Sequence, residues 1–275
     1  MSLGVSAVTL RIAVGGLGAI GKVVARRLDY GIEGLALSAV AARDAVRAKA
    51  AMSDFTQPVP VVPLAGLWEH ADVVVECAPG AVLRELAEPA LSHGRVVIIL
   101  SCGALLENFD LVDLARRHRG RILVPSGALL GLDAVAAAAE GGIATVHMVT
   151  RKPPRGLSGA PYLEENRIDI TALTQPKRVF TGTAREAAHG FPANVNVAAA
   201  LALAGIGPDR TTVEIWADPG VSRNTHRIEV DAKAARLSMQ VENVPSEENP
   251  RTGRLTALSV IAALQKMSSA LTVGT

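Results

Sequence analysis

Short apolar runs alternate with amphipathic, helix-like segments through the first 125 residues of the chain. The apolar runs predict strands at residues 10–14, 35–41, 59–62, 72–76, 95–100 and 121–124. Between them, helical periodicity predicts helices at residues 19–30, 44–52, 79–93 and 107–118. Several strands are apolar at nearly every position, which is typical of parallel strands buried on both faces. The alternation predicts an α/β domain with a doubly wound parallel sheet, whose ligands bind beyond the carboxyl ends of the strands.

The pattern changes after residue 125. The strand-like segments that follow are longer and alternate apolar with polar positions, at 143–150, 211–217, 224–231 and 236–244. This pattern indicates a mostly antiparallel sheet with one covered face. A helical segment at 193–204 interrupts it, and a last helix at 254–269 is expected to return to the first domain. The predicted domains are 1–125 with 246–275, and an inserted α+β domain at 126–245.

A glycine-rich turn joins the first predicted strand to the first predicted helix, with Gly-x-Gly-x-x-Gly at Gly16, Gly18 and Gly21. In a nucleotide-binding turn, the first glycine permits the tight turn, the second lets a pyrophosphate approach the backbone, and the third lets the helix pack closely. The alternative is an ordinary glycine-rich turn, but the strand–turn–helix context favours a Rossmann-type site for NAD or NADP. The expected contacts in this turn are Gly16, Leu17, Gly18, Ala19 and Ile20.

The end of the second predicted strand is the position that distinguishes NAD from NADP. An acidic side chain there binds ribose hydroxyls, whereas an arginine accommodates the 2′-phosphate. Arg43 precedes Asp44 at this position, so we predict that NADP is accepted, with dual use open; the alternative is a solvated pair at a helix start.

Loops after the later strands carry small residues that let a flat dinucleotide lie close to the backbone. They add four predicted cofactor contacts: Cys77, Ala78, Pro79 and Cys102. Cys102 is interpreted as a small crevice-lining residue rather than as a nucleophile, because nothing in the sequence lowers the pKa of its thiol.

Composition narrows the class of partner. The net charge is +2 with scattered basic residues, and aromatic residues make up 3%, so we expect no nucleic-acid partner and no basic patch for a membrane surface. Two cysteines without metal-ligand spacing predict neither a disulfide framework nor a metal site. The longest apolar helix-like run, 195–206, is too short for a bilayer, and Arg11 interrupts the first apolar stretch. We expect a cytoplasmic protein.

His226 is the titratable residue of most interest in the second domain. Period-2 alternation places it on the covered face with Asn224, and places Thr225 and Arg227 on the other face. From the residues alone, a core histidine with a satisfied hydrogen bond is favoured over a general acid or base.

Two asparagines open the helical segment near residue 195. Asn194 is either an N-cap or a ligand-binding residue. The amide of Asn196 can donate and accept at once, as recognition of a carboxamide such as nicotinamide requires.

Several segments together resemble the L-aspartate dehydrogenases over almost the whole chain. They are residues 16–21 (GLGAIG), 126–128 (SGA), 131–134 (GLDA), 150–154 (TRKPP), 191–198 (FPANVNVA), 218–219 (DP) and 224–226 (NTH). The resemblance implies that His226 is the active-site residue. It also implies that Ala128 and Asn196 contact the cofactor, NAD or NADP.

The implied reaction converts L-aspartate through iminosuccinate to oxaloacetate and ammonia, for NAD synthesis or aspartate catabolism. A histidine with a pKa near neutrality suits both the removal of the amino proton and the attack of water. The two substrate carboxylates need cationic or polar partners. The candidates are Lys152, Asn194, Asn224 and Thr225, with Arg151, Arg223 and, ranked lower, Arg227.

Other functions remain open on the residues. A two-domain reductase of the dihydrodipicolinate reductase or homoserine dehydrogenase type would share the first domain, and a semialdehyde dehydrogenase would use Cys102. A dinucleotide-sensing protein would bind without turnover. Trp216 lies on the opposite side of its strand from Val213 and Ile215, which suggests a homodimer surface on the second sheet.

Overall fold

The structure, a computed structural model, describes residues 9–246 and 253–274. Contacts divide the chain into two compact units, each considered by itself. Unit 1 comprises Met1–Ser101, Asn108–Pro125 and Ala257–Val273, and unit 2 comprises Cys102–Glu107, Ser126–Thr256 and Gly274–Thr275. Compared with the expected boundaries, unit 2 also takes in 102–107 and continues to 256.

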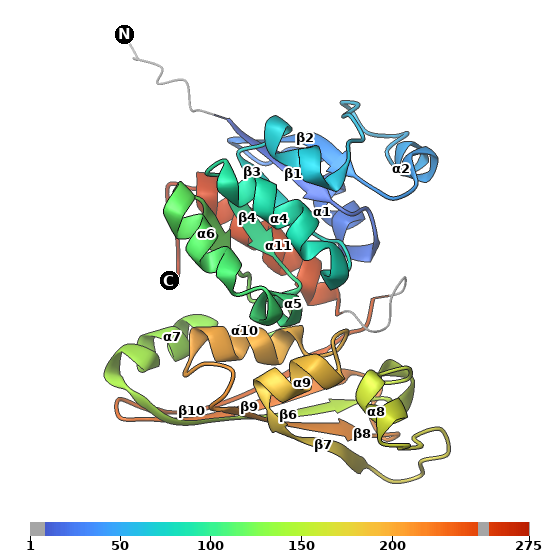
Figure 1. The fold of residues 1–275 in the computed structure, drawn as a ribbon, viewed down its shortest axis with the longest axis vertical. Helices are drawn as coiled ribbons and strands as arrows, with labels where there is room; N and C mark the ends of the chain where they lie inside the picture. The colour runs from blue at the N-terminus through green and yellow to red at the C-terminus, as the bar shows by residue number, and fades with distance from the viewer. Residues whose placement is uncertain (1–8, 247–252, 275) are drawn as a thin grey trace. The chain divides into compact units, whose positions relative to one another are not determined.

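Unit 1 contains the predicted Rossmann-like parallel sheet (Figure 1). Its strands are β1 (Leu10–Gly15), β2 (Leu35–Ala41), β3 (Val73–Glu76), β4 (Val96–Ile99) and β5 (Arg121–Leu123). They lie in the order β2-β1-β3-β4-β5, and every neighbouring pair is parallel. The chain therefore winds outward in both directions from β1 and β3, and the space beyond their carboxyl ends is the switch point of the sheet.

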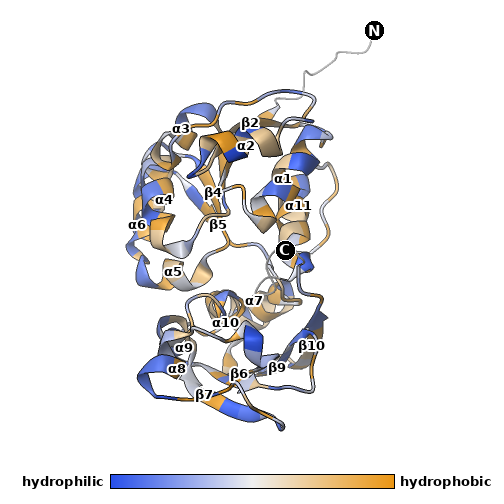
Figure 2. Cartoon of the chain, turned by 90° about the vertical axis from the view of Figure 1, so that its right-hand side faces the viewer, coloured by the Kyte–Doolittle hydropathy of each residue, from blue (hydrophilic) through white to orange (hydrophobic). Residues whose placement is uncertain are grey.

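The helices of unit 1 cover this sheet. They are α1 (Ala19–Asp29), α2 (Ala45–Ala51), α3 (Leu67–His70), α4 (Leu83–Ser92), α6 (Asp110–His118) and α11 (Arg254–Ser268), with short 3-10 turns at Leu64–Gly66 and Gly80–Val82. Val260 and Leu264 of α11 join the core formed by strand residues such as Val14 and Val75. The strand β4 is hydrophobic along its length (orange in Figure 2), whereas the helices carry both hydrophobic (orange) and hydrophilic (blue) residues.

The strand predicted at 59–62 is wrong as a full strand. A single parallel bridge joins Val61 to Val40 of β2, with two backbone bonds, Val40 N to Pro60 O and Val62 N to Val40 O. Pro58, Pro60 and Pro63 lack the N–H groups that a longer ladder would need. The outermost strand of the sheet is thereby reduced to one bridge.

Unit 2 contains a mixed sheet of five strands. They are β6 (Ile143–Lys152), β7 (Lys177–Thr183), β8 (Thr211–Ala217), β9 (Asn224–Ala232) and β10 (Arg236–Asn243), in the order β10-β9-β6-β8-β7. All neighbouring pairs are antiparallel except β6 with β8. The expectation of a mostly antiparallel second sheet is confirmed.

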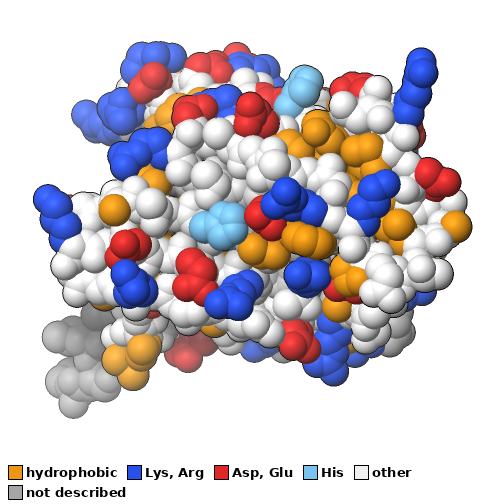
Figure 3. Space-filling model, turned by 90° about the horizontal axis from the view of Figure 1, so that it is seen from below, with side chains coloured by type: hydrophobic (Ala, Val, Ile, Leu, Met, Phe, Trp, Pro, Cys, Tyr) orange, Lys and Arg blue, Asp and Glu red, His pale blue; other side chains and the backbone are white. Residues whose placement is uncertain are grey.

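Helices cover one face of this second sheet and leave the other bare (Figure 1). They are α5 (Cys102–Glu107), α7 (Leu132–Gly141), α8 (Pro161–Glu165), α9 (Ala184–Gly190) and α10 (Asn196–Ala204), with a 3-10 turn at Pro154–Gly156. The bare face carries charged side chains of both signs with small hydrophobic groups between them (Figure 3). Trp216 lies on this face, on the side of β8 opposite the buried Val213 and Ile215.

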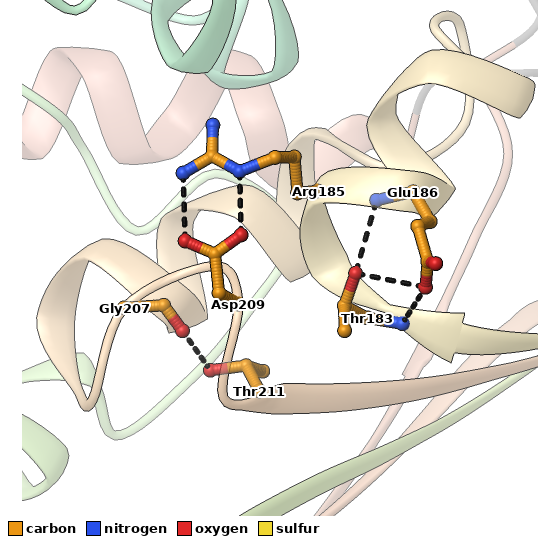
Figure 4. A network of polar contacts seen from close by, with 6 residues as sticks. All are labelled: Thr183, Arg185, Glu186, Gly207, Asp209 and Thr211. Atoms are coloured by element: carbon orange, nitrogen blue, oxygen red, sulfur yellow. Dashed lines mark hydrogen bonds and ion pairs between the residues drawn. The ribbon is translucent and has the colours of Figure 1, made fainter.

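Local polar contacts fix how α9 follows β7. Thr183 and Glu186 form a capping box at the start of α9, in which each side chain bonds the backbone N–H of the other (Figure 4). Arg185 pairs with Asp209 through two bonds of 2.6 and 2.9 Å, and so ties α9 to the turn before β8. Among the described residues, no helix is long and apolar enough to cross a membrane.

Candidate active site

The glycine turn of unit 1 has the geometry of a pyrophosphate site. Gly16 has a φ of +104°, and a Cβ there would lie 2.7 Å from the carbonyl oxygen of Cys77. A Cβ on Gly21 would collide with the carbonyl oxygen of Gly16, so both positions require glycine. A Cβ on Gly18 would meet nothing within 4 Å. The backbone at Gly18 is therefore open to an approaching ligand.

The first turn of α1 completes this site. Its N-cap is Gly18, no side chain caps it, and it contains no acidic residue. The N–H groups of the first turn and the positive end of the helix dipole are thus available to an anion. Ala19 and Ile20, two of the other predicted contacts, begin this turn, and Leu17 directly precedes its N-cap. The residues present fit a dinucleotide pyrophosphate.

The structure separates the roles of the two charged residues after β2. Asp44 is the N-cap of α2 and accepts a bond of 2.9 Å from the backbone N–H of Arg47. Arg43 is exposed and has no polar partner in the part of the chain that the structure describes. The backbone N–H of Gly16 bonds the carbonyl of Ala41, which holds the glycine turn against the end of β2. Arg43 therefore lies close to the turn with its guanidinium uncommitted.

The loop after β3 follows the switch-point strand directly and contains Cys77 and Ala78, which are half-buried, and Pro79, which is exposed. Burial raises the pKa of the Cys77 thiol well above its usual value. Cys102 belongs to unit 2, where it begins α5 and is 3% exposed. A buried position is what the interpretation of Cys102 as a small neutral residue requires.

A cluster of buried polar side chains lies on the helix-covered face of the second sheet. Thr150 and Lys152 project from β6, and Asn224 and His226 from β9; each is between 2% and 4% exposed. The register pairs Thr150 directly with His226, and their hydroxyl and Nδ1 atoms are 3.1 Å apart. The strands thus bring together four side chains that are up to 76 positions apart in the sequence.

His226 has a pKa of about 3, not the near-neutral value expected from the sequence. Burial of the imidazole is the larger cause, because it penalises the charged form, and the positive charge of Lys152 acts in the same direction. In this state the imidazole is neutral at physiological pH. It is therefore in the form that can accept a proton.

The ring atom Nε2 of His226 and the amide of Asn224 are not completely buried, although the two residues are only 2% and 4% exposed. Neither group has a hydrogen-bond partner within the described ranges. Among those ranges, the only buried side-chain nitrogen or oxygen that has no partner is Nε of Arg95. The polar atoms of His226 and Asn224 without a partner are therefore reachable, as groups that meet a ligand must be.

Asn194 joins this cluster through Lys152. The Nζ atom of Lys152 donates to Oδ1 of Asn194 at 2.8 Å and lies 3.4 Å from its carbonyl oxygen. The N-cap of α10 is Val195 without a side-chain bond, so the interpretation of Asn194 as the helix cap is wrong. Its side chain instead orients the lysine.

Asn196 begins α10, and its Oδ1 accepts a bond of 3.0 Å from the backbone N–H of Gly103. This bond occupies one acceptor site of the amide and leaves its NH₂ group for a ligand. Ala128 is buried, and its carbonyl accepts a bond of 2.8 Å from the side chain of Asn243. Asn243 was not among the candidate residues, because nothing in its local sequence sets it apart from other polar strand residues.

Other candidates lie apart from the cluster. Thr225 pairs with Arg151 across β6 and β9, on the opposite face from His226. Arg151 is paired with Asp218 at 3.2 Å and stacks over Trp216. Arg227 is exposed and paired with Glu229, as its lower rank anticipated, and Arg223 is exposed before β9. The structure groups Lys152, Asn194 and Asn224 with His226, but not Thr225 or these arginines.

A Rossmann-like unit with an open glycine turn and a second unit with a buried imidazole and lysine define a nicotinamide-nucleotide oxidoreductase. Residues 16–125 match the family described as "Homoserine dehydrogenase, NAD binding domain", and residues 133–267 match "Aspartate dehydrogenase, C-terminal". The chain belongs to the L-aspartate dehydrogenase family. It is 59% identical to L-aspartate dehydrogenase of Bradyrhizobium diazoefficiens, over 97% of this chain and 94% of that protein.

Other relatives agree. L-aspartate dehydrogenase 3 of Bordetella bronchiseptica is 58% identical over 97% of this chain and 98% of its own length. The solved structure of aspartate dehydrogenase from Thermotoga maritima superposes with a TM-score of 0.73, at 24% identity, over 96% of this chain and 99% of that one. At that identity the superposition supports the fold alone.

Proposed function

We propose that this chain catalyses the NAD(P)-dependent oxidative deamination of L-aspartate. L-Aspartate, oxidised dinucleotide and water would give oxaloacetate, ammonium, reduced dinucleotide and a proton. The observation that carries the proposal is the buried cluster of His226, Lys152 and Asn194 in a chain 59% identical to an L-aspartate dehydrogenase. A dicarboxylic amino acid offers this cluster both negative charge for the lysine and an amino proton for the imidazole.

The dinucleotide would be held by the backbone at Gly16 and Gly18 and by the N-terminus of α1, whose geometry fits a pyrophosphate. When bound, the nicotinamide ring supplies the acceptor for the hydride that leaves Cα. NADP use is supported by Arg43, which lies at the ribose position with no polar partner among the described residues.

The side chains of unit 2 would handle the charges and protons of the substrate. Lys152, oriented by Asn194, would bind one substrate carboxylate. His226, neutral and reachable at Nε2, would accept the amino proton and later assist the water that attacks the imine. A carboxylate beside Lys152 would offset the positive charge that lowers the pKa of His226, so substrate binding would make the imidazole a stronger base.

The assembly and location belong to the same proposal. A homodimer through the bare face of the second sheet is supported by Trp216 and Val149, which are half-buried beside charged side chains of neighbouring strands. A cytoplasmic location is supported by the dinucleotide requirement and by two free cysteines.

The test is formation of reduced dinucleotide from L-aspartate, followed by its absorbance, and the reverse reaction with oxaloacetate and ammonia. His226→Ala should lower kcat/KM by about 10²- to 10⁴-fold, the usual contribution of a general acid or base. His147→Ala is the matched control, because His147 lies in the same sheet and bonds Thr212 instead of facing the cluster. Unchanged turnover in His226→Ala would remove His226 from the mechanism.

Substrate identity is tested separately from the role of His226. Activity with dihydrodipicolinate or homoserine, and none with aspartate or with oxaloacetate plus ammonia, would overturn the proposed reaction. Dinucleotide binding without turnover of any amino acid would favour a sensor instead.

A further inference from the structure

Glu76 is a buried acid that the proposed mechanism does not use. It is the last residue of β3 and is 0% exposed. The parallel ladders pair it with Gly15 of β1 on one side and with Ile99 of β4 on the other. Gly15 directly precedes the glycine turn. Glu76 therefore lies at the switch point of the sheet, where a bound dinucleotide crosses the strand ends.

The carboxylate of Glu76 connects two neighbouring strand ends. Its Oε2 accepts bonds from the backbone N–H of Leu100 at 3.0 Å and of Ser101 at 2.8 Å. Its Oε1 accepts a bond of 3.1 Å from the hydroxyl of Ser101. Leu100 and Ser101 follow β4 directly. One side chain thus holds the segment after β4 against the end of β3.

These strand ends belong to the nicotinamide half of the site. A doubly wound sheet binds the two halves of a dinucleotide on either side of its switch point, and the ribose position after β2 marks the adenosine side. The β3 and β4 ends are on the other side. Cys77, which follows Glu76, presents its carbonyl to Gly16 of the pyrophosphate turn. The loop that begins at Cys77, directly after Glu76, therefore runs from the pyrophosphate turn toward the nicotinamide half of the site.

We propose that Glu76 is a positioning residue for the dinucleotide, and that its buried negative charge makes the site favour the oxidised over the reduced form. The oxidised nicotinamide ring carries a positive charge, and the reduced ring is neutral. A carboxylate shielded from water attracts the positively charged oxidised ring and not the neutral reduced ring. The inference rests on the proposed use of a nicotinamide dinucleotide, but not on aspartate as the substrate.

The hydrogen bonds of Glu76 match an ionised carboxyl. Burial raises its pKa, and the donors from Ser101 and Leu100 oppose that effect. Two backbone N–H groups and the Ser101 hydroxyl donate to the carboxyl, which is the pattern that stabilises the charged form.

The test is binding of NAD⁺ and NADH to the whole protein, measured by calorimetric titration without amino acid. Glu76→Gln keeps the shape and an oxygen for the two backbone bonds, but removes the charge. We expect its Kd for NAD⁺ to rise about tenfold more than its Kd for NADH. Glu85→Gln makes the same change at an exposed position of α4 and should leave both values unchanged. Equal weakening of both forms, or no weakening of either, would overturn the electrostatic part of the proposal.

Ser101→Ala tests the positioning role on its own. It removes one bond and keeps the carboxylate, so both forms should bind more weakly by the same factor and the ratio should stay at its wild-type value. This variant remains decisive if Glu76→Gln does not fold. Unchanged affinity for both forms would overturn the positioning role. A changed ratio of the two Kd values would show that the preference for the oxidised form does not come from the charge of Glu76. These titrations involve no turnover, so failure of the aspartate reaction would not be mistaken for failure here.

Discussion

At the scale of single residues, Lys152 acts on two partners in opposite ways. Its charge lowers the pKa of His226, and the same charge attracts a carboxylate. The unfolded chain protonates His226 below about pH 6.5, whereas the folded chain resists protonation down to about 3. The folded state therefore becomes less stable relative to the unfolded state as the pH falls from about 6.5 to about 3. This loss of stability arises at a position where a substrate carboxylate would supply the negative charge that the free protein lacks.

We expect Lys152→Met to raise the KM for L-aspartate by about 10- to 100-fold, because a hydrogen bond to a charged group contributes roughly 1.5–3 kcal/mol. The KM for the dinucleotide should not change. The pKa of His226 should rise above about 3, since a cation that disfavours imidazolium is gone, and stay below 6.5, since burial remains. Steady-state kinetics and an NMR titration of the imidazole measure the two effects.

Lys177→Met is the control, because Lys177 is an exposed lysine on β7 of the same sheet. It should leave both the aspartate KM and the imidazole titration unchanged. A Lys152→Met variant with an unaltered aspartate KM would contradict the assignment of Lys152 to a substrate carboxylate.

Arg43 concerns the choice between the two dinucleotides. We expect Arg43→Ala to raise the KM for NADP⁺ by about 10- to 100-fold and to leave the KM for NAD⁺ unchanged, because only NADP⁺ brings a 2′-phosphate to the guanidinium. Kinetics with each dinucleotide at saturating aspartate measure the effect. Arg117→Ala, at an exposed position of α6, serves as the control. An equal loss with both dinucleotides would indicate that Arg43 stacks on the adenine instead.

Residue patterns predicted part of the candidate site. Alternation along residues 224–230 was enough to place His226 on the covered face, where the structure has it. Its contact with Thr150 depends on the register between β6 and β9, which no local pattern contains. The bond between Lys152 and Asn194 likewise joins a strand to a loop 42 positions away. Local chemistry and the family resemblance thus identified Lys152, Asn194, Asn224 and His226, but missed Thr150, whose contact with His226 depends on tertiary packing.

At the scale of elements, strongly periodic segments were predictable and irregular ones were not. β7 was missed because its two buried residues, Val179 and Phe180, are adjacent instead of alternating. The register shifts between Arg178 and Phe180, which lets neighbouring residues point to the same face. α5 was missed because it is only six residues long and begins at Cys102, three positions after β4 ends at Ile99.

Proline explains why a full strand was predicted where the structure has a single bridge. Residues 59–62 have the composition of a strand, but alternate prolines leave too few N–H groups for a ladder. The helix predicted at 107–118 corresponds to α6 but starts three residues too early, since α6 begins at Asp110. Composition therefore indicated whether a segment is a helix or a strand, but the available backbone hydrogen bonds determined how long that element is.

At the scale of the whole molecule, the two sheets differ in what covers them. The first is enclosed by helices, whereas the second, of five strands, has helices on one face only (Figure 1). Strands of this length at the usual spacing give a flat area of roughly 600 Å², close to the roughly 800 Å² that each partner contributes to a standard interface. Arg151 and Arg178 lie over the ring of Trp216, so this face offers both an aromatic anchor and charges.

We expect the protein to have twice the 28.5 kDa mass of one chain in solution, and Val149→Glu to convert it to a monomer. Val149 lies between Arg227 of β9 and Glu214 of β8, so the new carboxylate would be buried at the centre of the interface. Val46→Glu makes the same change at a residue of α2 that is 80% exposed, and should leave the mass unchanged. Light scattering on the three proteins decides the matter, because a monomeric wild type, or a dimeric Val149→Glu variant, would show that this face is not the interface.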